Sequence, residues 1–253
     1  MDHWRDTGRM QLDPVDDFAS VAARNNADWC DLVARSHGVG GTVDADAWTS
    51  SVRTPPLYPD AVTLVRNVDA GSLLARVDAT GGCSIKDSFA ELDLAPHGFD
   101  VLFDAEWVSR APAVLNPVQD STLVWSAVTD GVTFDEWERG WRAADGSPPV
   151  LLPSLLEDCA VTIVGGARDG VIAAGAVLNH GHGVVGLSNV FSDLGDLGDL
   201  GGDAEVWTTV TDWIATTFPN QPIVGYESGR DLGAARRAGF ATVGPLRVWL
   251  KRT

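Results

Sequence analysis

The sequence predicts an α/β (α+β) fold in which a mixed, mostly antiparallel sheet is flanked by helices. Three apolar runs, at 160–167, 171–178 and 184–191, are separated by the segments ARDG and NHGHG, which are short and turn-like enough to close hairpins. Apolar residues at helical spacing occur before these runs, at 133–144, and after them, at 205–218. This succession of helix, hairpin-linked strands and helix indicates helices packed on a sheet.

The remaining C-terminal elements follow from shorter patterns. We expect a strand at 121–128 and a short helix at 153–158. The run 223–226 is apolar and β-branched, and the helix after it begins at the potential cap Ser228 and ends at Gly239-Phe240. Closing strands are then expected from Phe240 and from the apolar run 246–250.

The order of these elements resembles the GNAT superfamily, the acyl-coenzyme A dependent N-acyltransferases. Such a domain runs strand, two helices, three antiparallel strands, helix, strand, a helix that ends in Gly-Phe, and two strands. The resemblance covers about residues 121–253 and implies a GNAT-like acyltransferase domain there, preceded by an N-terminal α/β half at 1–113. It further implies transfer of an acyl group from acetyl-coenzyme A, or another acyl-coenzyme A, to an amine of a small molecule or peptide.

The coenzyme loop departs from the family pattern. GNAT enzymes hold the coenzyme A pyrophosphate with a Q/R-x-x-G-x-G/A loop before a helix. Here the segment SDLGDLGDLGGDAE, residues 192–205, has glycines but no preceding Arg or Gln, and it carries four aspartates. Carboxylates beside a pyrophosphate oppose binding. Either the loop turns its carboxylates outward, or it is a low-complexity segment in a non-catalytic GNAT-fold protein that binds another ligand or partner.

The resemblance also implies a set of site residues. The catalytic candidates are Glu227 as general base, at the C-terminal end of the fifth strand where the acyl group would lie, and Tyr226 and Ser188 of the fifth and fourth strands. Glu227 has a second interpretation, as a cap of the following helix. The position of the tyrosine that many GNAT enzymes use as general acid is occupied by Ala235. The coenzyme-binding candidates are Leu187, Asn189, Val190, Phe191, Gly195, Gly198, Gly201, Gly202, Arg230 and Arg236.

The N-terminal half contains a weak match to the C-terminal end. When 84–110 is placed beside the last residues, Gly98-Phe99 matches Gly239-Phe240 and Trp107 falls within one residue of Trp249. The match is either chance or a sign of tandem GNAT copies, one of them degenerate. Before it we expect a helix at 14–37, strands at 61–65 and 73–77, and a long loop at 38–60 that forms one wall of a substrate cleft. A linker is expected at 111–120.

Composition narrows the class of protein. The net charge of −17 makes nucleic acid an unsuitable partner. No apolar run exceeds eight residues and the first residues are polar, so we expect no membrane association and a cytoplasmic location. The three cysteines suit reduced thiols, and a Cys30–His37 hydrolase pair or a metal site at His180 and His182 is disfavoured because further partners are missing. The oligomeric state is left open.

Overall fold

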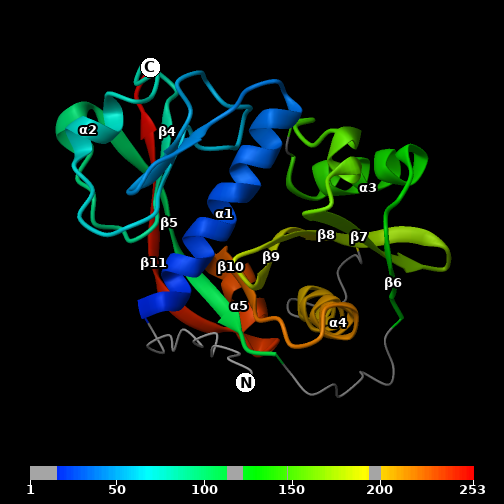
Figure 1. Cartoon of the computed structure of the whole chain (residues 1–253). Helices are drawn as coiled ribbons and strands as arrows, with labels where there is room; N and C mark the ends of the chain where they lie inside the picture. Colours follow the sequence, from blue (N-terminus) through cyan, green and yellow to red (C-terminus); the bar gives the residue numbers. More distant parts are fainter. Residues whose placement is uncertain (1–15, 113–121, 147, 194–200) are drawn as a thin grey trace, which may run out of the picture.

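The computed structural model describes residues 16–112, 122–146, 148–193 and 201–253, and Figure 1 shows their arrangement. In this part of the chain, the strands form one sheet in the order β1-β2-β3-β4-β11-β5-β10-β9-β8-β7-β6. Most neighbouring strands are antiparallel, and the pairs β3–β4 and β9–β10 are parallel. Helices lie on both faces of the sheet, so the predicted α/β fold class is confirmed.

The C-terminal elements agree with the sequence prediction to within a few residues. Helix α3 begins where the Asp130 carboxylate accepts hydrogen bonds from the backbone N–H groups of Val132 and Thr133, both at 3.0 Å. The elements are β6 (Val124–Ala127), α3 (Gly131–Asp145), the 3₁₀ turn η2 (Pro153–Glu157), β7 (Val161–Arg168), β8 (Val171–Gly181), β9 (Val184–Ser192), α4 (Gly201–Thr217), β10 (Ile223–Glu227), α5 (Gly229–Arg237) and β11 (Ala241–Lys251).

The N-terminal elements agree with the prediction less well. The segment predicted as a strand at 73–77 is the end of helix α2 and a turn, because Asp69 caps that helix by accepting a 2.8 Å hydrogen bond from the Ser72 N–H. The elements are α1 (Asp16–Ser36), β1 (Thr42–Val43), β2 (Ala47–Thr49), β3 (Ala61–Thr63), α2 (Ala70–Leu74), β4 (Ser84–Asp87), the 3₁₀ turn η1 (Ala95–His97) and β5 (Phe99–Arg110).

The two halves exchange their last strands at the centre of the sheet. Strand β5 of the N-terminal half lies between β10 and β11, and β11 of the C-terminal half lies between β5 and β4. The expected two closing strands are therefore wrong, since Ala241–Lys251 is one strand and β5 fills the place of the second. Gly98 and Gly239 precede the exchanged strands with φ of 78° and 89°, which favours glycine at both corners. Common descent of the halves stays a prediction, as does the boundary between them.

Strand alternation gives each face its own helices. In β8, Ala176 and Leu178 belong to the core that also contains α4 and α5, and Val177 between them belongs to the core with α3. Helix α1 lies on the α3 face and crosses the junction of the halves (Figure 1). Its alanines pack on strands β5, β9, β10 and β11, so α1 joins the two halves.

A pair of buried amides also fixes α1 to the C-terminal half. The Asn179 side chain on β8 donates a 2.9 Å hydrogen bond to the Asn25 carbonyl, and the Asn25 side chain donates one of 3.3 Å to the Asn179 carbonyl. Gly186 makes room for this pair, because a Cβ there would lie 2.0 Å from the Asn25 Oδ1. The position of α1 over the sheet is therefore set by polar contacts as well as by apolar packing.

Candidate active site

The site begins where strands β9 and β10 stop pairing. Their parallel register contains only Ile223↔Val185 and Val224↔Gly186, although β10 pairs with β5 as far as Glu227 and β9 pairs with β8 as far as Ser192. The β8–β9 register shifts between Gly175 and Val177, and Asn189 opposite this shift has φ of 51°. Asparagine tolerates this left-handed conformation better than most residues. The edge of β9 that faces β10 beyond Gly186 is thus left without strand partners.

A cavity of about 190 Å³ lies at the end of β9, between α3 on one face of the sheet and α4 and α5 on the other. Its walls are the end of β9, the first turns of α4 and α5, and the last turn of α3. Helix α4 begins at Gly201 and Gly202, so its positive N-terminal end is near, but Asp231 of α5 also lines the cavity and adds negative charge. The lining residues are Ala144, Val190, Phe191, Ser192, Val206, Trp207 and Asp231.

The coenzyme-binding candidates lie in different surroundings. Val190 and Phe191 line this cavity, whereas Asn189 lines a cavity beside α1. The Leu187 side chain is buried in the core, so that residue can contribute only backbone groups. Arg230 and Arg236 are exposed on α5 and do not line the cavity. Gly195 and Gly198 lie outside the described residues, and Gly201 and Gly202 form the start of α4.

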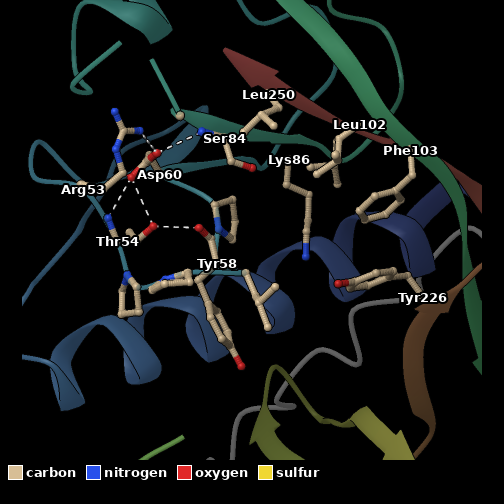
Figure 2. Close-up of a pocket in the computed structure, with 16 residues that line it drawn as sticks. Arg53, Thr54, Tyr58, Asp60, Ser84, Lys86, Leu102, Phe103, Tyr226 and Leu250 are labelled. Carbon is tan, nitrogen blue, oxygen red and sulfur yellow. Dashed lines mark hydrogen bonds and ion pairs between the residues drawn. The ribbon is translucent and has the colours of Figure 1, made fainter. Parts of the chain in front are cut away.

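Two neighbouring cavities lie on the α1 side, at the junction of the halves. The larger, of about 460 Å³, is bounded by the loop 53–60 and by strands β4, β5, β10 and β11. The smaller, of about 210 Å³, extends toward α1 and Asn189. They share the lining residues Leu57, Tyr58, Pro59, Lys86 and Tyr226. Of the loop expected at 38–60, residues 53–60 line this cavity (Figure 2), whereas strands β1 and β2 occupy 42–43 and 47–49, and a substrate cleft here stays a prediction.

A hydrogen-bond network around Asp60 holds the loop 53–60 in place. The Asp60 carboxylate is buried, forms an ion pair with Arg53, and accepts hydrogen bonds from the backbone N–H groups of Thr54 at 2.9 Å and Ser84 at 3.0 Å. The Thr54 hydroxyl donates a 2.7 Å hydrogen bond to the Tyr58 carbonyl (Figure 2). The negative charge of Asp60 is thus matched by Arg53, and the loop is fixed at both ends.

Lys86 is the functional candidate that the sequence patterns missed. Its side chain is 4% exposed, yet it lines both cavities of the α1 side. The Nζ donates a 2.7 Å hydrogen bond to the Asn26 Oδ1 and lies 4.1 Å from the centre of the Tyr226 ring (Figure 2). The sequence shows that Lys86 and Lys251 are the only lysines of the chain, which by itself does not indicate a site.

The three catalytic candidates lie in different surroundings. Tyr226 lines the α1-side cavities and packs edge-on against Trp107, with 5.6 Å between the ring centres. Glu227 points to the opposite face, because neighbouring residues of a strand alternate, and it does not line the described cavities. The Ser188 hydroxyl donates a 3.0 Å hydrogen bond to the Asn189 Oδ1. The structure brings Tyr226 and Asn189 together, and the roles of all three candidates stay predictions.

Burial decides the protonation state of Glu227. Removal from water, with a smaller contribution from the Asp231 carboxylate, raises its pKa from 4.5 to about 8. At neutral pH most of the Glu227 side chains therefore carry a proton. Ala235, at the position of the family tyrosine, is fully buried in the core and supplies no acid.

The disfavoured alternatives have no support in this geometry. Burial raises the pKa of the Cys30 thiol, and the His37 Nε2 lies 2.7 Å from the Val150 carbonyl oxygen rather than beside that thiol. His182 contacts the Asp28 carboxylate at 2.8 Å. Across the ranges that the structure describes, no group of His, Cys, Asp and Glu is arranged to hold a metal ion, and no helix is long and apolar enough to cross a membrane.

Comparison with solved structures identifies the fold. A GCN5-related N-acetyltransferase from Kribbella flavida aligns with 92% of this chain and 96% of its own, at 17% sequence identity and a TM-score of 0.63. A conserved protein of unknown function from Staphylococcus epidermidis aligns with 84% and 93%, at 9% identity and a TM-score of 0.59. A GCN5-related N-acetyltransferase from Sphaerobacter thermophilus aligns with 94% and 93%, at 14% identity and a TM-score of 0.52.

These alignments extend over both halves of the chain and not only over residues 121–253. The sequence itself matches no family model and no curated protein. The resemblance to the GNAT superfamily is thus confirmed at the level of the fold: the chain has the architecture of the GCN5-related N-acetyltransferases.

Proposed function

We propose that this protein is an N-acyltransferase that moves an acyl group from acyl-coenzyme A to an amine of a small molecule or peptide. The observation that supports it is the end of β9–β10 pairing at Gly186, with one cavity beside that opening at the end of β9, between α3, α4 and α5, and another beside α1. Adjacent residues of β9 line these two cavities, Val190 the first and Asn189 the second. A thioester that enters from one cavity would meet an amine that enters from the other.

The chain's own groups suit this reaction. The unpaired edge of β9 beyond Gly186 offers backbone N–H and C=O groups to the pantetheine amides, and an N–H there polarises the thioester carbonyl without a special side chain. Coenzyme A supplies the activated acyl group. The amine nitrogen forms a bond to the acyl carbon, the carbon–sulfur bond breaks, and the proton lost by the amine is balanced by the proton that the thiolate gains.

Glu227 is the proposed proton-transfer residue. Its pKa of about 8 is near the working pH, which is where a general acid or base is most effective. The Glu227 side chain lies on the α4–α5 face, as does Asp231, which lines the proposed coenzyme cavity. Glu227 therefore lies closer to the proposed position of the leaving thiol than to an amine in the α1-side cavities. This position supports proton donation to the thiolate below pH 8, and water would then accept the proton of the amine.

Calorimetry and a thiol-release assay test the proposal together. We expect acetyl-coenzyme A to bind with micromolar to millimolar affinity, because the α4 N-terminus attracts the pyrophosphate while Asp231 opposes it. A panel of small amines and short peptides should then release free coenzyme A thiol with formation of the acylated amine, measured by mass spectrometry. If neither acetyl-coenzyme A nor a longer acyl-coenzyme A gives binding heat or thiol release, the proposal that this protein is an N-acyltransferase is refuted. The alternative, a GNAT-fold binding protein without a pyrophosphate site, would then be preferred.

A further inference from the structure

Lys86 carries a buried positive charge that no carboxylate balances within the described part of the chain. An ammonium group has three N–H donors, and the protein supplies one hydrogen-bond acceptor, the Asn26 Oδ1, together with the face of the Tyr226 ring. A buried charge is costly unless it is paired and hydrogen-bonded. Figure 2 shows the Lys86 side chain extending from β4 into the cavity, so its remaining donors face open space that a ligand can fill.

The other charges of these cavities are already neutralised. The lining includes one further cation, Arg53, and one carboxylate, Asp60, and these two form an ion pair at one end of the larger cavity. Lys86 therefore dominates the electrostatic field where the two cavities meet. An anionic group is the ligand chemistry that such a site recognises.

The rest of the larger cavity is mainly apolar. Leu102 and Phe103 of β5 and Leu57 of the loop are exposed large hydrophobic side chains, at 53%, 37% and 63% of their surface. They lie on the same cavity as Lys86, together with Val248, Leu250 and the prolines at 55, 56 and 59. A ligand that is anionic at one end and apolar at the other would cover this surface and pair with the lysine.

We propose that Lys86 binds the carboxylate of the acceptor, and that the acceptor is an amino acid with an apolar side chain. This inference rests on the proposed function and specifies its substrate class. Lys86 and Asn189 line the same cavity of about 210 Å³, and Asn189 stands at the β9–β10 opening. In an α-amino acid the amine is one carbon away from the carboxylate. A carboxylate on the Lys86 Nζ thus keeps the amine within this small cavity, while the apolar side chain occupies the larger one.

Binding of matched ligand pairs, measured by calorimetry without coenzyme, tests this proposal. The probes are L-phenylalanine and L-leucine, each with the amine that lacks the carboxylate, 2-phenylethylamine and 3-methylbutylamine. We expect at least one amino acid to bind about 10-fold or more tightly than its decarboxylated partner, because a hydrogen bond to a charged group is lost in the latter. Equal affinity within both pairs, or no binding of any probe, would overturn the proposal. Inorganic phosphate that displaces the amino acid and binds more tightly would also overturn the choice of a carboxylate.

Three lysine variants separate recognition from folding. Lys86→Met keeps the length of the side chain but removes the charge, and it should abolish the preference for the carboxylate. Lys86→Arg keeps a cation and should retain a preference. Lys251→Met makes the same chemical change at the only other lysine, whose Nζ contacts the His97 carbonyl, and it should leave the preference unchanged.

Thermal denaturation distinguishes a ligand-binding role of Lys86 from a purely structural role. We expect Lys86→Met to melt at or above the wild-type temperature, because it removes an unpaired buried charge. Lys86 would be shown to be structural only by two results together. Lys86→Met would melt at a lower temperature than wild type and bind no probe, and Lys86→Arg would bind the two members of each pair equally. Carboxylate-dependent binding without acyl transfer would preserve this inference and refute the proposed function. Acyl transfer at the same rate to amines with and without a carboxylate would support the proposed function and refute this inference.

Discussion

Stability should fall as pH rises because the partly buried Glu227 carboxyl group is removed from water, and Glu227→Gln should remove that loss. The folded protein keeps the Glu227 proton up to a pKa of about 8, whereas the ordinary value of 4.5 describes the unfolded chain. Between these two values the folded state holds more protons than the unfolded state, so stability decreases as pH increases. Below pH 4.5 both states are protonated and the contribution is constant. Above pH 8 both are ionised and the full penalty is present.

The two pKa values set the size of the effect. Each pH unit between them corresponds to about 1.4 kcal/mol. Relative to pH 4.5, Glu227 therefore lowers the free energy of unfolding by about 3 kcal/mol at pH 7 and by about 5 kcal/mol above pH 8. Glutamine has nearly the same shape as protonated glutamate and cannot ionise. Glu227→Gln should therefore match wild type near pH 4.5 and exceed it by about 3 kcal/mol at pH 7. With a urea slope of about 3 kcal/mol per molar, the midpoint should rise by about 1 M.

Urea unfolding at pH 5, 7 and 9, followed by tryptophan fluorescence, measures this difference. Asp87 is also buried, and burial raises the pKa of its carboxyl group, so the wild-type slope alone does not isolate Glu227. The difference between wild type and Glu227→Gln does. Glu157→Gln is the control, because it makes the same change on an exposed side chain of η2. A stability difference that stays constant from pH 5 to 9 would refute the assignment of a raised pKa to Glu227.

Four further outcomes are expected. Glu227→Gln should lower turnover about 100-fold without changing acetyl-coenzyme A affinity if Glu227 transfers the proton, and unchanged turnover would return it to a structural role. Gly186→Ala should cost about 2–3 kcal/mol in chemical denaturation, because its Cβ would lie 2.2 Å from the Asn179 Oδ1, whereas Gly40→Ala meets nothing within 4 Å and should be neutral. Asp231→Asn should raise acetyl-coenzyme A affinity about 3–10-fold in low-salt calorimetry, and a loss of affinity would contradict the electrostatic reasoning. Residues 121–253 expressed alone should aggregate or lack native near-ultraviolet dichroism, and cooperative unfolding of a soluble fragment would show an independent domain.

The predicted C-terminal elements were those whose signals are local. The runs that form β7, β8 and β9 are apolar, separated by short turns and paired with their sequence neighbours, so each strand and its partner can be read together. The same approach wrongly predicted a strand at 73–77. The apolar residues there do not reveal that Asp69 caps a helix, α2, which covers the start of this segment. The approach also failed for the closing strands, because β11 pairs with residues of β5 that lie 132 to 152 positions earlier.

Only the part of the candidate site that the C-terminal half contributes could be predicted from the sequence. Asn189 and Tyr226 could be chosen because the family resemblance points to the fourth and fifth strands of the C-terminal half, and both residues line one cavity in the structure. Lys86 could not, because its burial depends on α1 lying over β4 and on Tyr226 arriving from the other half. The local pattern of β4 gives no indication of either neighbour. The large α1-side cavity likewise exists only once the two halves are joined.

The position of β5 between β10 and β11 constrains how the protein is made. During synthesis the first half leaves the ribosome with β5 complete, but both strands that flank β5 in the finished sheet lie more than 110 residues later, within 223–253. The N-terminal half therefore cannot complete its part of the sheet while it is the only part available, and β4 and β5 each wait with an open edge for β11. Folding of the sheet must then wait for residues 223–253, and we expect it to be slow because the central strand pairs join residues far apart in the sequence.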